Sequence, residues 1–170
     1  MGMKYNKAYE GEDFEKYLEY LGTIKGKLPR DIFEFISDPN RHDFGEDSLH
    51  DSWLKSVECS HNFETRTADI TLTLLGAYHD RIFRLNFRNV SQYKFFQQML
   101  DSDRDLITYE VCIEEDYKKK EKLVFRAEFA GEEAEIEIYS AEISIEEEII
   151  NEQKNGVQQA VWRQRGCVLG

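Results

Sequence analysis

The first forty residues carry the apolar spacing of two helices. Between Gly11 and Lys27, apolar side chains recur every three or four positions, which places them on one face of a helix. Pro29 suits the first turn of a second, shorter helix, and the turn-forming string Asp38-Pro39-Asn40 ends it. The residues expected to point inward are Phe14, Tyr17, Leu18 and Leu21 in the first helix and Ile32, Phe33 and Ile36 in the second. We therefore expect a helical hairpin.

After a polar loop at 40–48, apolar and polar residues alternate with a period of two, which is typical of half-buried β-strands. The alternation predicts about six strands. Their inward residues are expected to be Trp53, Val57 and Cys59; Ile70, Leu72 and Leu74; Phe83, Leu85 and Phe87; Ile107, Tyr109, Val111 and Ile113; Leu123, Phe125, Ala127 and Phe129; and Ile136 and Ile138.

Two stretches depart from this regular alternation. The apolar residues Ala141, Ile143 and Ile145 have the opposite parity from those that precede them, which indicates a β-bulge and a bend near Tyr139-Ser140. The aromatic-rich stretch from Ser91 to Asp103 fits either a short helix or an irregular extension of a strand.

Together these patterns predict an α+β fold, with two N-terminal helices packed on a mostly antiparallel β-meander of about six strands. The length of 170 residues is that of one domain. We expect residues 1–150 to form this single domain and residues 151–170 to form a tail or a weak docking helix.

Charge and composition narrow the classes of function. The formal net charge of -12 opposes binding to nucleic-acid phosphates and favours a basic protein partner, although negative charge also serves solubility alone. The three cysteines are far apart, so neither a disulfide framework nor a zinc knuckle is indicated, and no cofactor is expected. No apolar run is long enough to cross a bilayer. The expected location is the cytoplasm.

Three of the four histidines are followed by aspartate, as in His50-Asp51 and His79-Asp80. An imidazole with a carboxylate can bind a metal ion or carry out general acid–base chemistry. Adjacent residues of a strand point to opposite faces, however, so such a dipeptide does not normally present both side chains to one metal. We favour a structural role for these polar residues, with Trp53 beside them, and the metal-dependent enzyme stays the alternative.

The string Ser48-Leu49-His50-Asp51-Ser52-Trp53-Leu54 resembles the L-H-D start of the first strand in several families of small bacterial proteins. These families are uncharacterised or are assigned to immunity roles in polymorphic toxin systems. The resemblance covers about Leu49 to Val90 and includes the strands at 70–74 and 83–87. It implies a protein that binds a toxin, with no active site to transfer. In such a family the His-Asp pair can hydrogen-bond to neighbouring backbone and fix where strand pairing starts.

Glutamates occupy most of the polar strand positions near the end of the sheet region. They are expected to form one acidic sheet face that docks a cationic partner, or simply a solvated outer face, through Glu128, Glu133, Glu135, Glu137 and Glu142. The leading hypothesis is therefore a non-enzymatic, immunity-like protein that binds a basic protein such as a toxin. The alternatives are a small metal-dependent enzyme built on the His-Asp pairs and a structural subunit of an oligomer.

Overall fold

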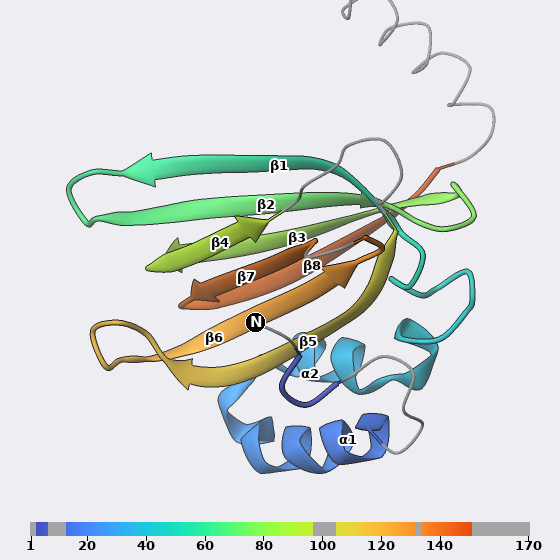
Figure 1. The fold of residues 1–170 in the computed structure, drawn as a ribbon, viewed down its shortest axis with the longest axis horizontal. Helices are drawn as coiled ribbons and strands as arrows, with labels where there is room; N and C mark the ends of the chain where they lie inside the picture. The colour runs from blue at the N-terminus through green and yellow to red at the C-terminus, as the bar shows by residue number, and fades with distance from the viewer. Residues whose placement is uncertain (1–2, 7–12, 97–104, 132–133, 151–170) are drawn as a thin grey trace, which may run out of the picture.

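The computed structural model describes residues 3–6, 13–96, 105–131 and 134–150. Two α-helices come first, α1 (Asp13–Ile24) and α2 (Arg30–Ser37), each followed by a 3-10 turn, η1 (Lys25–Lys27) and η2 (Pro39–Arg41). The strands are β1 (Trp53–Asn62), β2 (Thr67–Leu75), β3 (Arg81–Val90), β4 (Gln92–Phe96), β5 (Leu106–Glu115), β6 (Glu121–Phe129), β7 (Glu135–Ser140) and β8 (Glu142–Ile149) (Figure 1). The expected α+β class and the two N-terminal helices are confirmed.

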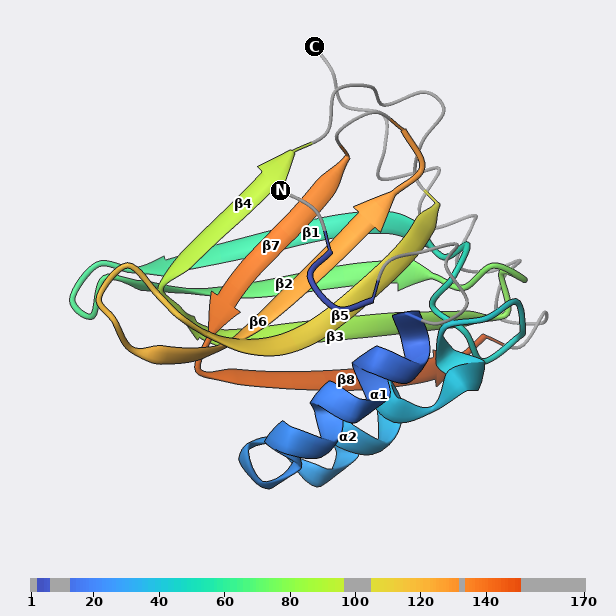
Figure 2. The ribbon, with the colours of Figure 1, turned by 60° about the horizontal axis from the view of Figure 1, so that its bottom comes forward.

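The strands form two antiparallel sheets of four. Sheet A has the order β1-β2-β3-β8, and sheet B has the order β4-β7-β6-β5. The strands of one sheet cross those of the other, with the core between them (Figure 2). The expected single meander is therefore wrong in its pairing, because β3 pairs with β8 and β4 pairs with β7.

Two long strands bend and supply one strand to each sheet. β3 continues into β4 through Ser91, and β7 continues into β8 through Ala141. At the corner the Ser91 N–H donates to the Tyr139 carbonyl at 3.0 Å, and the Ala141 N–H donates to the Arg88 carbonyl at 3.0 Å. Strands that switch sheets at a bend are the usual corners of orthogonally packed sheets. The six runs of the sequence pattern thus become eight strands.

The change in apolar alternation after Ile138 explains how the chain keeps its apolar residues buried on both sides of the bend. Ile136 and Ile138 are buried in sheet B, and Ile143 is buried in sheet A on the other side of the corner. The bend expected near Tyr139-Ser140 is confirmed. Of the stretch left open between Ser91 and Asp103, residues 92–96 are strand β4, and residues 97–103 lie outside the described residues.

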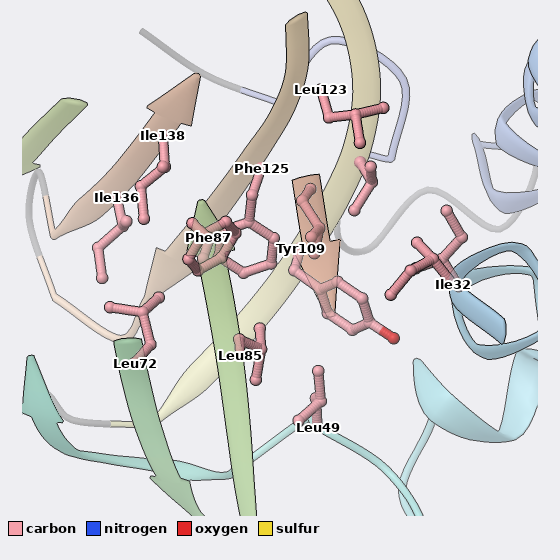
Figure 3. Packing of buried hydrophobic residues seen from close by; sticks show 14 of the residues in the cluster. Ile32, Leu49, Leu72, Leu85, Phe87, Tyr109, Leu123, Phe125, Ile136 and Ile138 are labelled. Carbon is pink, nitrogen blue, oxygen red and sulfur yellow. The ribbon is translucent and has the colours of Figure 1, made fainter. Parts of the chain in front are cut away.

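One core fills the space between the sheets. Leu72, Leu85 and Phe87 of sheet A point toward Phe125 and Ile138 of sheet B (Figure 3). The rings of Phe87 and Phe125 lie 5.2 Å apart, a favourable distance for an aromatic pair. Helix α2 adds Ile32 and Ile36, and α1 adds Tyr17 and Leu21 to the same cluster. The inward residues expected of β2, β3 and β6 are buried as the alternation indicated.

The outer edge of β5 is sealed by side chains. The Tyr17 hydroxyl accepts the Val111 N–H at 2.8 Å and donates to the Val111 carbonyl at 3.2 Å. The Tyr20 hydroxyl accepts the Ile113 N–H at 2.9 Å, and the Asn6 amide donates to the Tyr109 carbonyl at 2.9 Å. Unpaired backbone groups on an edge strand invite pairing with another chain. Helix α1 and the N-terminal segment remove that risk on this side.

Replacing Tyr17 by Phe should lower the free energy of unfolding by about 1–3 kcal/mol, since the buried backbone of Val111 then loses its partner. Chemical denaturation followed by circular dichroism measures this difference. The control is Tyr78→Phe, which alters a mostly exposed hydroxyl in the turn between β2 and β3 and should leave stability unchanged. Equal stability of Tyr17→Phe and wild type would contradict the sealing role.

Candidate functional site

The Leu49-His50-Asp51 string joins the start of β1 to the start of β5. Leu49 is fully buried in the core. The His50 imidazole Nδ1 lies 2.7 Å from the Ile107 carbonyl, to which it donates, and the Asp51 N–H donates to the Leu106 carbonyl at 2.8 Å. Asp51 has φ of 59°, the left-handed conformation in which Asp is one of the tolerated residues. Both polar residues bind backbone where the two strands begin.

The other two His-Asp pairs, His42-Asp43 and His79-Asp80, lie elsewhere and make different contacts. His79 is an exposed turn residue whose ring lies 4.5 Å from the ring of Trp53, and the Asp80 carboxylate accepts hydrogen bonds from Arg81. Trp53 itself is partly exposed and is not a core residue. Within the described ranges, no three His, Cys, Asp or Glu side chains are close enough together to hold a metal ion.

His42 has a role that the sequence pattern did not single out. Its ring stacks on Tyr109 at 4.3 Å, donates from Nε2 to the Ile36 carbonyl at 2.8 Å and accepts the Asn6 amide at Nδ1 at 3.2 Å. It therefore links the end of α2, the N-terminal segment and β5. Burial lowers the pKa of His42 to about 4, so the ring is neutral at pH 7.

The glutamates expected on one acidic face occupy different places. Glu137 is buried, and its carboxylate accepts the Arg126 Nε–H at 2.7 Å. Glu128 accepts the Met3 N–H at 3.0 Å, and Glu135 lies 3.6 Å from the Lys94 ammonium. Glu142 is exposed but belongs to sheet A, and Glu133 lies outside the described residues. The expected single, free acidic face is therefore wrong, because the bend divides these residues between two sheets and cations neutralise most of those in sheet B.

Arg126 is the centre of a nearly buried ion network on the outer face of sheet B. Its side chain is 9% exposed, and besides Glu137 it contacts Glu110 at 3.2 Å and Glu114 at 2.7 Å. Burial alone would raise the pKa of Glu114, but hydrogen bonds from Arg126 and Lys4 lower it to about 2. Next to them, burial raises the pKa of the Cys112 thiol to about 12, which keeps it unreactive at neutral pH.

The Glu110 carboxylate also holds the N-terminal segment. It accepts the consecutive backbone N–H groups of Lys4, Tyr5 and Asn6 at 3.0, 2.7 and 3.0 Å. Glu110 is fully buried beneath this segment. The network thus connects the N-terminal segment to three strands of sheet B. Its charges are paired within the molecule.

An exposed apolar surface lies where the two sheets end on the side away from the helices. We call it the β1–β4 edge surface, and its exposed members are Val57 (40%), Phe63 (89%), Tyr93 (40%), Phe95 (36%) and Tyr117 (62%). Strands β1 and β4 are the edge strands of sheets A and B. The His61 Nε2 lies 3.2 Å from the Tyr93 hydroxyl and connects the two strands.

The inner side chains of these edge strands extend beyond the core. Val57 lies opposite Leu72, and Tyr93 lies opposite Ile138; both of these partners are buried, whereas Val57 and Tyr93 are not. Beside them, an open hollow of about 540 Å³ is lined by residues including His61, Phe63, Arg66, Tyr93 and Tyr117. The expectation that Val57 and Cys59 face the same side is met, but they are exposed there.

The buried neutral state of His42 makes stability depend on pH. The unfolded chain protonates this residue near pH 6.5 and the folded protein only near pH 4, so the unfolded state binds more protons between these values. Wild-type stability should fall by about 2 kcal/mol from this cause between about pH 7 and about pH 5. His42→Gln should flatten that dependence, as measured by urea denaturation across the range, and His79→Gln should not. Parallel curves for wild type and His42→Gln would contradict the assignment.

Replacing Arg126 by Met leaves buried carboxylates without their cation. The free energy of unfolding should drop by about 3–5 kcal/mol at pH 7. The matched variant Arg84→Met breaks an exposed pair with Glu148 and should cost less than about 1 kcal/mol. Denaturation curves that show the same loss for both variants would mean that the network does not stabilise sheet B.

Comparison with known proteins does not assign the chain to a family. No protein family, curated protein or solved structure matches it. In the described part of the chain, no helix has both the length and the apolar character needed to span a bilayer. The likeness of residues 49–90 to immunity-type proteins stays a prediction.

Proposed function

We propose that this protein is a non-enzymatic binding protein that engages a basic protein partner through the β1–β4 edge surface. The observation that carries the proposal is a group of exposed aromatic side chains: Phe63, Tyr93 and Tyr117 line one hollow, and the Phe95 ring centroid lies 5.4 Å from that of Tyr93. Val57 is exposed on the adjoining strand β1. Contiguous exposed apolar surface on a folded protein usually marks an interaction site. Aromatic residues are also the residues most enriched in protein interfaces.

The charge of the chain selects the kind of partner. A net charge of -12 repels acidic proteins and nucleic acids and attracts basic proteins, which speeds their encounter. In this proposal the β1–β4 edge surface makes the contact, and the negative electrostatic field of the whole protein attracts the partner. An immunity-like protein that blocks a basic toxin would combine these two properties, in keeping with the resemblance of residues 49–90.

Site-specific photocrosslinking in the cells that make the protein tests this function. Benzophenone-bearing phenylalanine in place of Phe63 should crosslink to a protein of net positive charge, which mass spectrometry of the adduct identifies. The same substitution at Tyr78, an exposed aromatic residue in the turn at the opposite end of sheet A, is the control and should give no such adduct (Figure 1).

Three outcomes would refute the proposal. They are an absence of adducts at Phe63, the same adduct at both positions, or an adduct that joins two copies of this chain. The last of these would instead support the alternative of an oligomeric subunit.

A further inference from the structure

Among the described residues, most of β1 has one backbone edge that no other strand pairs with. The start of the strand is tied to β5, because the Leu106 N–H donates to the Ser52 carbonyl at 2.9 Å and Trp53 forms a bridge with Asp105. From Ser56 to Asn62, β1 is hydrogen-bonded to β2, and no other described strand pairs with it. Within the part of the chain that the structure describes, the opposite edge of β1 along these residues is therefore open to another strand, unlike the sealed edge of β5.

The inner side of this open edge is apolar. Val57, Cys59 and His61 share the inner face of β1, because they lie opposite the buried residues Leu72, Ile70 and Ala68 of β2. On sheet B, Tyr93 and Phe95 lie opposite buried Ile138 and Ile136, so they share the inner face of β4. A strand placed beside β1 would have its inward side chains next to these residues. Every second residue of that strand should therefore be apolar.

The outer side of the same edge carries one exposed carboxylate. Glu58 lies on the outer face of β1 in register with Thr71, whereas Asp69, on the same face of β2, is paired with Arg88 at 2.9 Å. Opposite charges on directly facing strand positions stabilise pairing, and like charges weaken it. The outward residue that faces Glu58 should therefore be Lys or Arg, and the net charge of -12 favours basic residues at the other outward positions. The open edge thus specifies a segment that alternates apolar and basic residues.

We propose that an extended segment of the partner, with alternating apolar and basic residues, adds to β1 along Ser56–Asn62 as a further strand of sheet A. This mode of binding rests on the proposed function and states how the β1–β4 edge surface is used. Main-chain hydrogen bonds supply part of the affinity in such strand addition, and the alternate side chains supply the specificity. A second copy of this chain fits less well, because pairing β1 with itself would bring two Glu58 side chains to the same edge and two charges of -12 together.

The test uses the full chain and a fluorescent peptide of about eight residues that alternates Val and Lys, a length suited to a single strand. Fluorescence anisotropy should show saturable binding, and a peptide that alternates Val and Glu should bind at least about tenfold more weakly. Two further peptides carry N-methyl groups on all Val or on all Lys residues. Because successive N–H groups of a strand point to opposite edges, one of them should lose binding and the other should keep it.

Matched protein variants locate the site. Val57→Lys and Phe95→Ser should each weaken binding of the Val-Lys peptide about tenfold, and Tyr78→Ser should leave it unchanged. Circular dichroism of each variant shows that it is folded. A variant that is unfolded is replaced by Phe63→Ser, which alters a side chain that is almost fully exposed.

Several results would overturn strand addition: no binding of the Val-Lys peptide, equal binding of the two N-methylated peptides, or a dimer in light scattering that Val57→Lys dissociates. If a basic protein crosslinks at Phe63 while the peptides fail these tests, the proposed function stands and only the mode of binding is wrong. If no crosslink forms, the function itself falls.

Discussion

The whole fold depends on two long strands that pair with each other on both sides of one bend. Pairing of β3 with β8 and of β4 with β7 gives each sheet one strand from each bent segment, so the corner at Ser91 and Ala141 joins the two sheets. The bend turns apolar faces toward each other and creates one core from two sheets. It also leaves two edge strands, β1 and β4, on the side away from the helices, where the core ends.

Much of the secondary structure could be predicted from the sequence, because the spacing of apolar residues in a helix or a strand depends on local backbone geometry. The helices, the strand alternation and the change in alternation at residues 139–141 all follow from such spacing. The spacing of apolar residues does not show whether a second sheet covers a given face of a strand. Val57 and Leu72 look equivalent in the sequence, yet only Leu72 lies beneath sheet B, while Val57 is 40% exposed at the edge. The candidate site lies where this information is missing.

The glutamates show a related limit. Parity correctly placed Glu137 on an outer face, but the cation that neutralises it, Arg126, comes from the neighbouring strand and is positioned by the sheet register. Register is a long-range property, so the composition of one strand gives the sign of its charge and not its partner. The histidines show the same limit, because His50 donates to the carbonyl of Ile107, 57 positions away, and His42 donates to the carbonyl of Ile36.

The hydrogen bonds between Glu110 and the N-terminal segment affect the order in which the protein folds. The hydrogen bonds from Lys4, Tyr5 and Asn6 to Glu110 span 104 to 106 positions of sequence, and that from Met3 to Glu128 spans 125. Contacts that close such long loops carry an entropic cost until the intervening chain is already compact. During synthesis the backbone N–H groups of this segment have none of these carboxylate acceptors until β5 has left the ribosome. Residues 3–6 are thus among the last to reach their native positions, although they precede both helices and all eight described strands in the sequence.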